Sequence, residues 1–459
     1  MPRSGRLVSL ALSLLFSGAA ALVYQVVWVR QLTTVLGTTL EAVSTVLGVF
    51  MLGLGVGGAL AARFIDRLPS STLPRIYAAL EIGIAAFALL FPPIVAAFTP
   101  LFRFAPAILL ALPTTLMGAT LPTAVALREH ARGDSDGAGR SAGILYAFNT
   151  AGAVAGSLAT GLVLLPWAGI RITTIGAVSL NALAAAVVLL GTRGERDPGE
   201  RNARSARYST ASRIALAVAA LSGFAALVNE VAWTRSLVLL IGPTTYGFSF
   251  VVSSVILGLA LGSAAGARFR RKEGARSLAW AQLGAALSSL ALLQILGRLS
   301  LPVGHLVHRH ADDMIALLGI ELAAVAALLL PASFFFGATF PLAVGIVSRE
   351  GAGPAEATGA TLAWNTAGAL SGSLAAGFLL IPHLGAEGAL YAAFGIHLFA
   401  AGVVYSPKPL VPALAALGLA AATPFVLPRW DRELLTGGLY KYASYMEPGE
   451  FLDFLRQGE

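Results

Sequence analysis

Two copies of one short motif carry the residues whose chemistry is easiest to interpret. Each copy has an amide or carboxyl residue, a tryptophan three positions later and an arginine two positions after that. These residues are Gln25, Trp28 and Arg30 in the first copy and Glu230, Trp233 and Arg235 in the second. A carboxylate inside an apolar helix costs about 3 kcal/mol, so it usually faces a cavity or a polar partner. Glu230 is therefore a candidate ligand for a cation or a coupled proton. A hydrogen-bond network between helices is an equally good interpretation.

The tryptophan and arginine of the motif can be interpreted as structural residues at the membrane surface instead of solute-binding residues. Trp is common in the interfacial belt of a membrane, and Arg extends its charged end toward water. Glu230 and Arg235 are five residues apart, about 140° around a helix, so they cannot pair within it. A charge partner for Glu230 must come from another helix.

Four more polar residues within apolar segments are candidate solute-binding residues. They are Asn149, Asn365, Glu81 and Glu321. Each asparagine precedes a GxxxG spacing, which favours helix packing over solute contact. The two glutamates are acidic candidates because an acidic lining suits a cationic solute.

The sequence predicts no catalytic residue, cofactor or metal. It has no cysteine, and it has no GxSxG, Walker or paired-histidine motif. His305, His308 and His310 fit no standard ligand spacing, and an exposed connecting loop is the favoured interpretation. No basic stripe interleaved with aromatic residues indicates a nucleic-acid partner.

The composition is that of an integral membrane protein. Of the 459 residues, 57% are hydrophobic and 12% are charged, with a mean hydropathy of +0.78. A soluble chain carries about twice that charge. Apolar runs of roughly 20 residues recur along the chain, so the lipid bilayer is its predicted environment.

The chain is a duplicated unit. SGAAALVYQVVWVR at 17–30 returns as SGFAALVNEVAWTR at 222–235, and NTAGAVAGSLATG at 149–161 returns as NTAGALSGSLAAG at 365–377. The predicted fold is an all-α polytopic membrane protein of two tandem six-helix repeats, related by an axis along the membrane normal. We expect a first repeat at 1–191, a cytoplasmic linker at 192–212, a second repeat at 213–406, a further apolar helix at 407–428 and a polar tail at 429–459.

The basic residues predict the orientation. With a cytoplasmic N-terminus, 21 of the 31 Lys and Arg lie on the cytoplasmic side, six lie opposite and four lie in the tail. This asymmetry follows the positive-inside rule and explains the net charge of +8. The tail lies outside if the additional helix spans, and inside if that helix is peripheral.

The repeated helices also resemble a known family. ALVYQVVWVRQLTTVLG and ALVNEVAWTRSLVLLIG, followed by GLGVGGALAARF and GLALGSAAGARF, resemble the membrane domain of bacterial spermidine-synthase-like proteins, the major-facilitator/spermidine-synthase fusions. GALAARFIDR is a loose match to the loop signature of major-facilitator transporters. The tail WDRELLTGGLYKYA resembles the start of the family's aminopropyltransferase domain, whose catalytic residues do not appear before Glu459.

The resemblance implies a function and a location. We expect a transporter-like domain in the bacterial inner membrane that binds or moves a small cationic solute, such as a polyamine. The alternative is a non-transporting anchor or scaffold for an aminopropyltransferase domain or subunit in polyamine biosynthesis.

Overall fold

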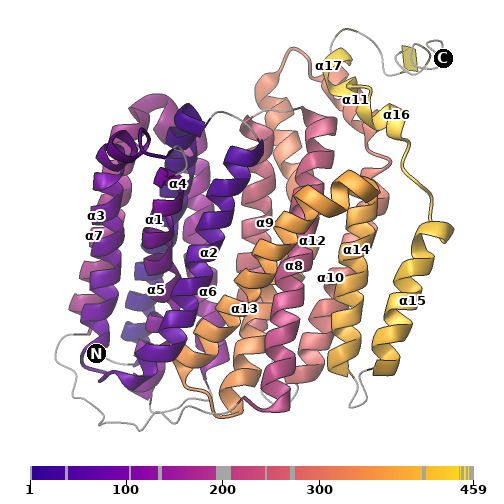
Figure 1. Ribbon diagram of the computed structural model, residues 1–459. Helices are drawn as coiled ribbons and strands as arrows, with labels where there is room; N and C mark the ends of the chain where they lie inside the picture. The colour runs from indigo at the N-terminus through magenta and orange to yellow at the C-terminus, as the bar shows by residue number, and fades with distance from the viewer. Residues whose placement is uncertain are drawn as a thin grey trace.

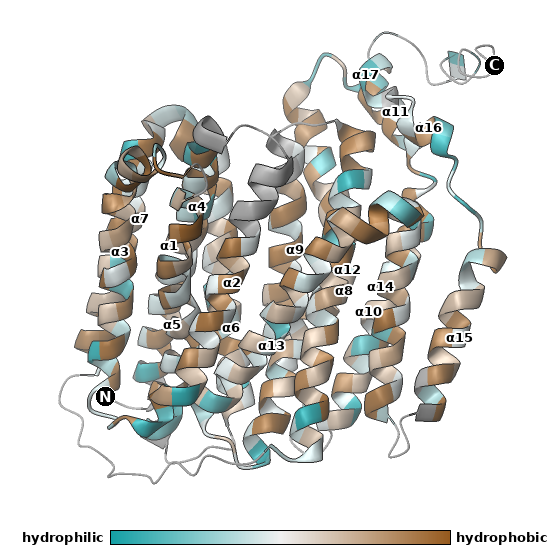
Figure 2. Ribbon diagram, viewed as in Figure 1, coloured by the Kyte–Doolittle hydropathy of each residue, from teal (hydrophilic) through white to brown (hydrophobic). Residues whose placement is uncertain are grey.

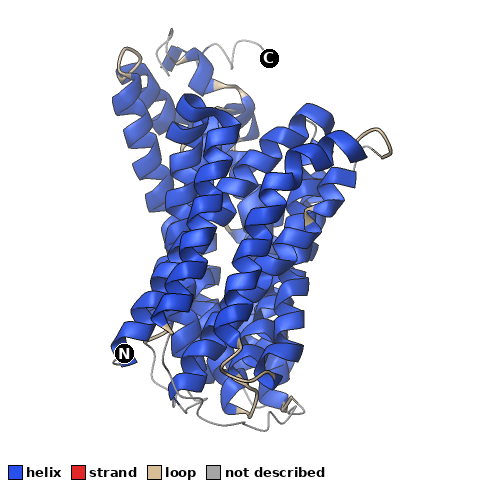
Figure 3. Cartoon of the chain, turned by 90° about the vertical axis from the view of Figure 1, so that its left-hand side faces the viewer, coloured by secondary structure: helices blue, strands red, loops and turns tan. Residues whose placement is uncertain are grey.

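Helices account for almost all of the described chain. A computed structural model describes residues 3–36, 40–102, 105–132, 137–192, 208–242, 245–268, 274–405 and 410–443, with Tyr445, 449–450 and Asp453 beyond them. The helices run roughly parallel, and the described N- and C-terminal residues lie at opposite ends of the bundle (Figures 1 and 3). Most of the predicted linker, from 193 to 207, lies outside the described residues.

The first half of the chain forms one bundle of helices. Its elements are α1 (Arg3–Leu36), α2 (Leu40–Phe64), the short η1 (Ile65–Arg67), α3 (Leu73–Phe98), α4 (Ala105–Leu109), α5 (Ala111–Arg132), α6 (Ala138–Ala159), η2 (Thr160–Leu164) and α7 (Leu165–Gly191).

The second half repeats this order with one additional helix and a tail. Its elements are α8 (Thr210–Ile241), α9 (Thr245–Gly266), α10 (Gly274–Leu296), α11 (Ser300–Arg309), α12 (Met314–Arg349), α13 (Pro354–Ala375), η4 (Ala376–Leu380), α14 (Ile381–Tyr405), α15 (Leu410–Val426), α16 (Arg432–Thr436) and α17 (Leu439–Tyr442).

Both halves turn at equivalent glycines. After a π-helical turn, the chain bends at Gly169 with φ 69° and at Gly385 with φ 73°. This left-handed region is costly for a residue with a Cβ atom, so glycine is suited to both turns. Each turn separates the fifth spanning helix of its half from the sixth.

The helices have the length and hydropathy of membrane spans. The described residues contain nine long apolar stretches, and two of them, Ala138–Gly191 and Pro354–Tyr405, include the glycine turns. Apolar residues cover most of the helix surfaces, and hydrophilic residues gather toward the ends of the bundle (Figure 2). Together with the shorter apolar α9 and α15, these stretches form the two six-helix repeats and the additional helix.

The repeated sequences make the same contacts in both halves. A Cβ atom at Gly152 or Gly156 of α6 would overlap backbone atoms of α1, and one at Gly368 or Gly372 of α13 would overlap those of α8. Close helix approach therefore depends on these small residues. The GxxxG interpretation of the sequence agrees with these contacts.

The histidine segment is a helix, and the prediction of a connecting loop was wrong. His305 and His308 lie on α11, a ten-residue helix, and His310 follows it. The buried Val307 packs with Ala443 of the tail, and His308 Nδ1 lies 2.9 Å from the Ala443 carbonyl oxygen. These tertiary contacts, which the local sequence does not reveal, stabilise a helix here.

The tail packs against the second half through Trp430. The indole Nε1 donates a hydrogen bond to the Leu293 carbonyl of α10 at 2.9 Å, and the Trp430 backbone N–H donates to Glu387 of α14 at 3.3 Å. Gly297 leaves room for the indole ring, which a Cβ atom at that position would overlap.

Trp430→Phe should loosen the tail without unfolding the bundle. Phenylalanine keeps the ring but loses the indole hydrogen bond, a change of about 1 kcal/mol. We expect protease cleavage within 430–443 to become about fivefold faster in detergent solution. Tyr445→Phe is the control because Tyr445 is 89% exposed. Equal cleavage rates for wild type and Trp430→Phe would show that the hydrogen bond does not hold the tail.

Candidate functional site

The two halves meet closely at the end of the bundle where the N-terminus lies. There α2 packs against α13, with Gly58 beside Gly359. On the other side of the bundle, α6 packs against α9 and α12. Ser263 of α9 donates a hydrogen bond to the Gly143 carbonyl of α6 at 3.1 Å and is fully buried. These paired contacts close this end.

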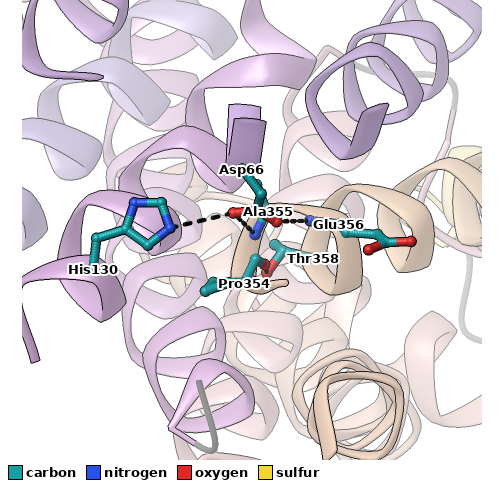
Figure 4. Close-up of polar contacts among 6 residues, drawn as sticks. All are labelled: Asp66, His130, Pro354, Ala355, Glu356 and Thr358. Atoms are coloured by element: carbon teal, nitrogen blue, oxygen red, sulfur yellow. Dashed lines mark hydrogen bonds and ion pairs between the residues drawn. The ribbon is translucent and has the colours of Figure 1, made fainter. Parts of the chain in front are cut away.

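Asp66 connects the halves by capping a helix of the other half (Figure 4). Its Oδ1 accepts from the Ala355 N–H at 3.1 Å, and its Oδ2 accepts from the Glu356 N–H at 2.8 Å. These N–H groups lie in the first turn of α13, whose own N-cap residue, Gly353, makes no side-chain bond. A carboxylate at this position satisfies free donors and opposes the positive end of the helix dipole.

The residues around Asp66 allow and support this contact. A Cβ atom at position 353 would overlap the Asp66 carboxylate, so glycine makes room for it. His130 Nε2 of α5 lies 3.7 Å from Asp66 Oδ1. Tyr208, just before α8, hydrogen-bonds the Glu356 side chain, and partial burial together with that carboxyl raises the pKa of Tyr208 to about 12.

Glu230 lies on α8 in the sector between α13 and α12. Gly223 of α8 contacts Asn365 of α13. Glu230 lies seven residues after Gly223, and therefore about 20° from Gly223 around the helix. Trp233 lies about 60° further round and stacks on Phe336 of α12. Both α12 and α13 also contact the first half.

The Glu230 side chain is partly exposed. Among the described residues, no cation and no hydrogen-bond donor reaches its carboxylate. A carboxylate at this depth without a partner is a candidate site for a cationic solute. Gln25 occupies the equivalent position on α1, is also partly exposed and carries no charge.

The motif tryptophans are core residues, so the interfacial alternative was wrong for them. Trp28 is 1% exposed and Trp233 is fully buried. Trp28 packs between Tyr24 of its own helix and the Phe87 and Phe91 rings of α3. The arginines of the motif, Arg30 and Arg235, are exposed near the other end of these helices. Spacing alone did not reveal which face of each helix is buried.

The remaining candidates lie apart from Glu230. Asn149 and Asn365 lie where α6 meets α1 and where α13 meets α8, and Asn365 donates to the Ala219 carbonyl at 3.0 Å. Glu321, 9% exposed, lies near the start of α12. Glu81 is fully buried on α3 within the first half. The candidates therefore do not form one cluster.

Solved structures of two transporters have a similar arrangement of helices. A bacterial homologue of the iron transporter ferroportin, in an outward-facing state with soaked iron, matches with a TM-score of 0.60 and 13% identity, covering 89% of this chain and 98% of that one. The human organic anion transporter MFSD10 (TETRAN) matches with a TM-score of 0.52 and 13% identity, covering 91% and 100%.

The fold is that of the major-facilitator transporters. One neighbour is described as an iron transporter homologue and the other as an organic anion transporter, so the fold alone does not select a solute. No family model and no curated protein matches the sequence. The chain thus shares its fold with these transporters, and any solute must be argued from its own side chains.

Proposed function

We propose that this membrane domain binds or moves a small cationic solute, such as a polyamine, between its two halves. Glu230 carries the proposal. The residue is partly exposed in the sector between α12 and α13, and its carboxylate has no cationic partner among the described residues. An ammonium group at that position would neutralise the carboxylate and replace the water it loses.

The preference for a polyamine comes from the sequence resemblance to spermidine-synthase-like proteins. The two structural neighbours neither support nor oppose it. The closed end supports movement of the solute, because Asp66 joins the halves through a few polar contacts that can break and re-form. Rigid-body rocking of one repeat against the other around a central site is the general means of alternating access.

Uptake into proteoliposomes tests the transport proposal. Glu230→Gln should reduce the uptake of labelled putrescine or spermidine about tenfold, because the loss of about 1.4 kcal/mol of charge attraction weakens binding by that factor. Glu350→Gln is the matched control, since Glu350 is an exposed carboxyl at the end of α12. Uptake that is equal in wild type, Glu230→Gln and empty liposomes would refute transport of these solutes.

The docked tail favours a second candidate function, a membrane scaffold for an aminopropyltransferase. The buried Trp430 and Leu435 hold the start of the tail against the second half. This segment resembles the start of the catalytic domain in the fusion family. A scaffold predicts that Glu230→Gln leaves the binding of an added aminopropyltransferase unchanged, whereas deletion of 429–459 abolishes it. Co-purification in detergent measures that binding.

A further inference from the structure

Glu81 is a fully buried carboxyl in the core of the first half, away from the contacts between the halves. It lies on α3, which packs against α5 and α7. Its Oε2 accepts a hydrogen bond from Asn181 Nδ2 of α7 at 2.6 Å. Tyr24 of α1 donates in turn to Asn181 Oδ1 at 2.7 Å. The tyrosine therefore fixes the amide so that its N–H group faces Glu81.

No cation balances this carboxyl among the described residues. The titratable groups that face it are Tyr24 of α1 and Tyr77 of α3. From α5, the apolar Leu116 lies opposite Gly83, two residues from Glu81. The Ser17 and Tyr77 hydroxyls also lie beside the carboxyl, whereas its second oxygen, Oε1, is buried without a hydrogen-bond partner. An ionised group surrounded only by neutral side chains in an apolar bundle is strongly disfavoured.

The second half places a neutral amide at the equivalent position. Glu81 and Gln282 follow Arg75 and Arg276 by six residues and precede Gly83 and Gly284 by two. Asn181 and His397 correspond in the same way, each twelve residues after its glycine turn, Gly169 or Gly385. Each half therefore has a polar pair at these equivalent positions of its third and sixth spanning helices.

The two pairs also have the same hydrogen-bond direction. His397 Nδ1 lies 2.9 Å from Gln282 Oε1, and Gln282 Nε2 donates to Thr339 Oγ1 at 2.8 Å. Because Gln282 has an N–H group to donate, its oxygen accepts from His397, as Glu81 accepts from Asn181. A protonated glutamic acid has nearly the shape and the charge of a glutamine.

We propose that Glu81 is a proton-binding site in the core of the first repeat, with its proton on Oε1 in this conformation. The carboxylate takes one proton from water, and it returns the proton when movement of α3 against α1 and α7 admits water. Gln282 keeps the same hydrogen-bonded shape in the second repeat but cannot release a proton. Of these two equivalent positions, only the one in the first repeat can therefore respond to pH.

Infrared difference spectroscopy of the reconstituted protein tests this site directly. At neutral pH, wild type should show the C=O band of one protonated carboxylic acid, which Glu81→Gln removes while the protein remains folded, as glutamine is accepted at position 282. Asn181→Leu should shift that band to higher frequency, because the hydrogen bond to Oε2 is lost. Glu350→Gln is the control and should leave the band unchanged.

Two outcomes would overturn the proposal. One is a wild-type spectrum without a protonated carboxyl band at neutral pH. The other is a band that neither Glu81→Gln nor Asn181→Leu alters. If Glu81→Gln fails to fold, the shift in Asn181→Leu still decides, since that variant keeps the carboxyl. The measurement needs no solute, so its failure leaves the transport proposal standing, and failed uptake leaves this site standing.

Discussion

Asp66→Asn is expected to open the end of the molecule where α2 meets α13. The substitution keeps the shape of the side chain but removes the charge that accepts two backbone N–H groups of α13. Hydrogen bonds to a charged group contribute about 1.5–3 kcal/mol each. A net loss of about 2 kcal/mol would shift the equilibrium roughly thirtyfold toward conformations in which the halves separate.

Cysteine labelling measures this opening, because the chain has no cysteine of its own. Ser263→Cys is a nearly isosteric probe at a fully buried position between the halves. Its reaction with a small maleimide should be about thirtyfold faster when Asp66→Asn is also present.

Asp313→Asn is the matched control for this experiment. Asp313 also caps a helix, accepting from the Ala316 N–H at 3.0 Å, but that helix is its own. Labelling rates that are equal with and without Asp66→Asn would show that the capping contact does not hold the halves together.

Gly152→Leu should prevent the first half from assembling. A side chain at this position meets the Leu15 carbonyl of α1, and a backbone group cannot move aside as a flexible side chain can. Overpacking usually costs about 1–3 kcal/mol, and we expect at least the upper value here because two helices must separate along their length.

Thermal unfolding in detergent, followed by size-exclusion chromatography, measures this effect. Gly176→Ala is the control, because nothing lies within 4 Å of a Cβ atom added there. We expect Gly152→Leu to aggregate or to lose its folded peak at temperatures where Gly176→Ala remains intact. A folded, thermally unchanged Gly152→Leu would contradict the close α1–α6 contact.

The fold was predictable because it depends on patterns that repeat along the chain. Apolar runs of spanning length and the duplicated segments indicated two six-helix repeats, and the GxxxG spacings indicated which helices pack closely. The tryptophans were harder to place. A helix buried on several sides has little amphipathic pattern, so the sequence did not show that Trp28 and Trp233 face the protein interior.

The polar contacts were less predictable because they join residues that are distant in sequence. Asp66 caps a helix that begins 288 positions later, at Pro354. The only local signal was a helix start at Gly353-Pro354 without a capping side chain, which leaves donors to be satisfied from elsewhere. Glu81 was a candidate from its depth alone, but its pairing with Asn181 required the structure. The ligand of Glu230 stays a prediction.

The additional helix α15 leads to the end of the bundle opposite the N-terminus. It starts at the end of the bundle where the N-terminus lies and runs toward the opposite end, where α16 and α17 lie (Figure 1). If the arginine-rich loops face the cytoplasm, as their distribution predicts, these last helices stand in the extracytoplasmic water. An enzyme docked on them would draw its reactants from that compartment.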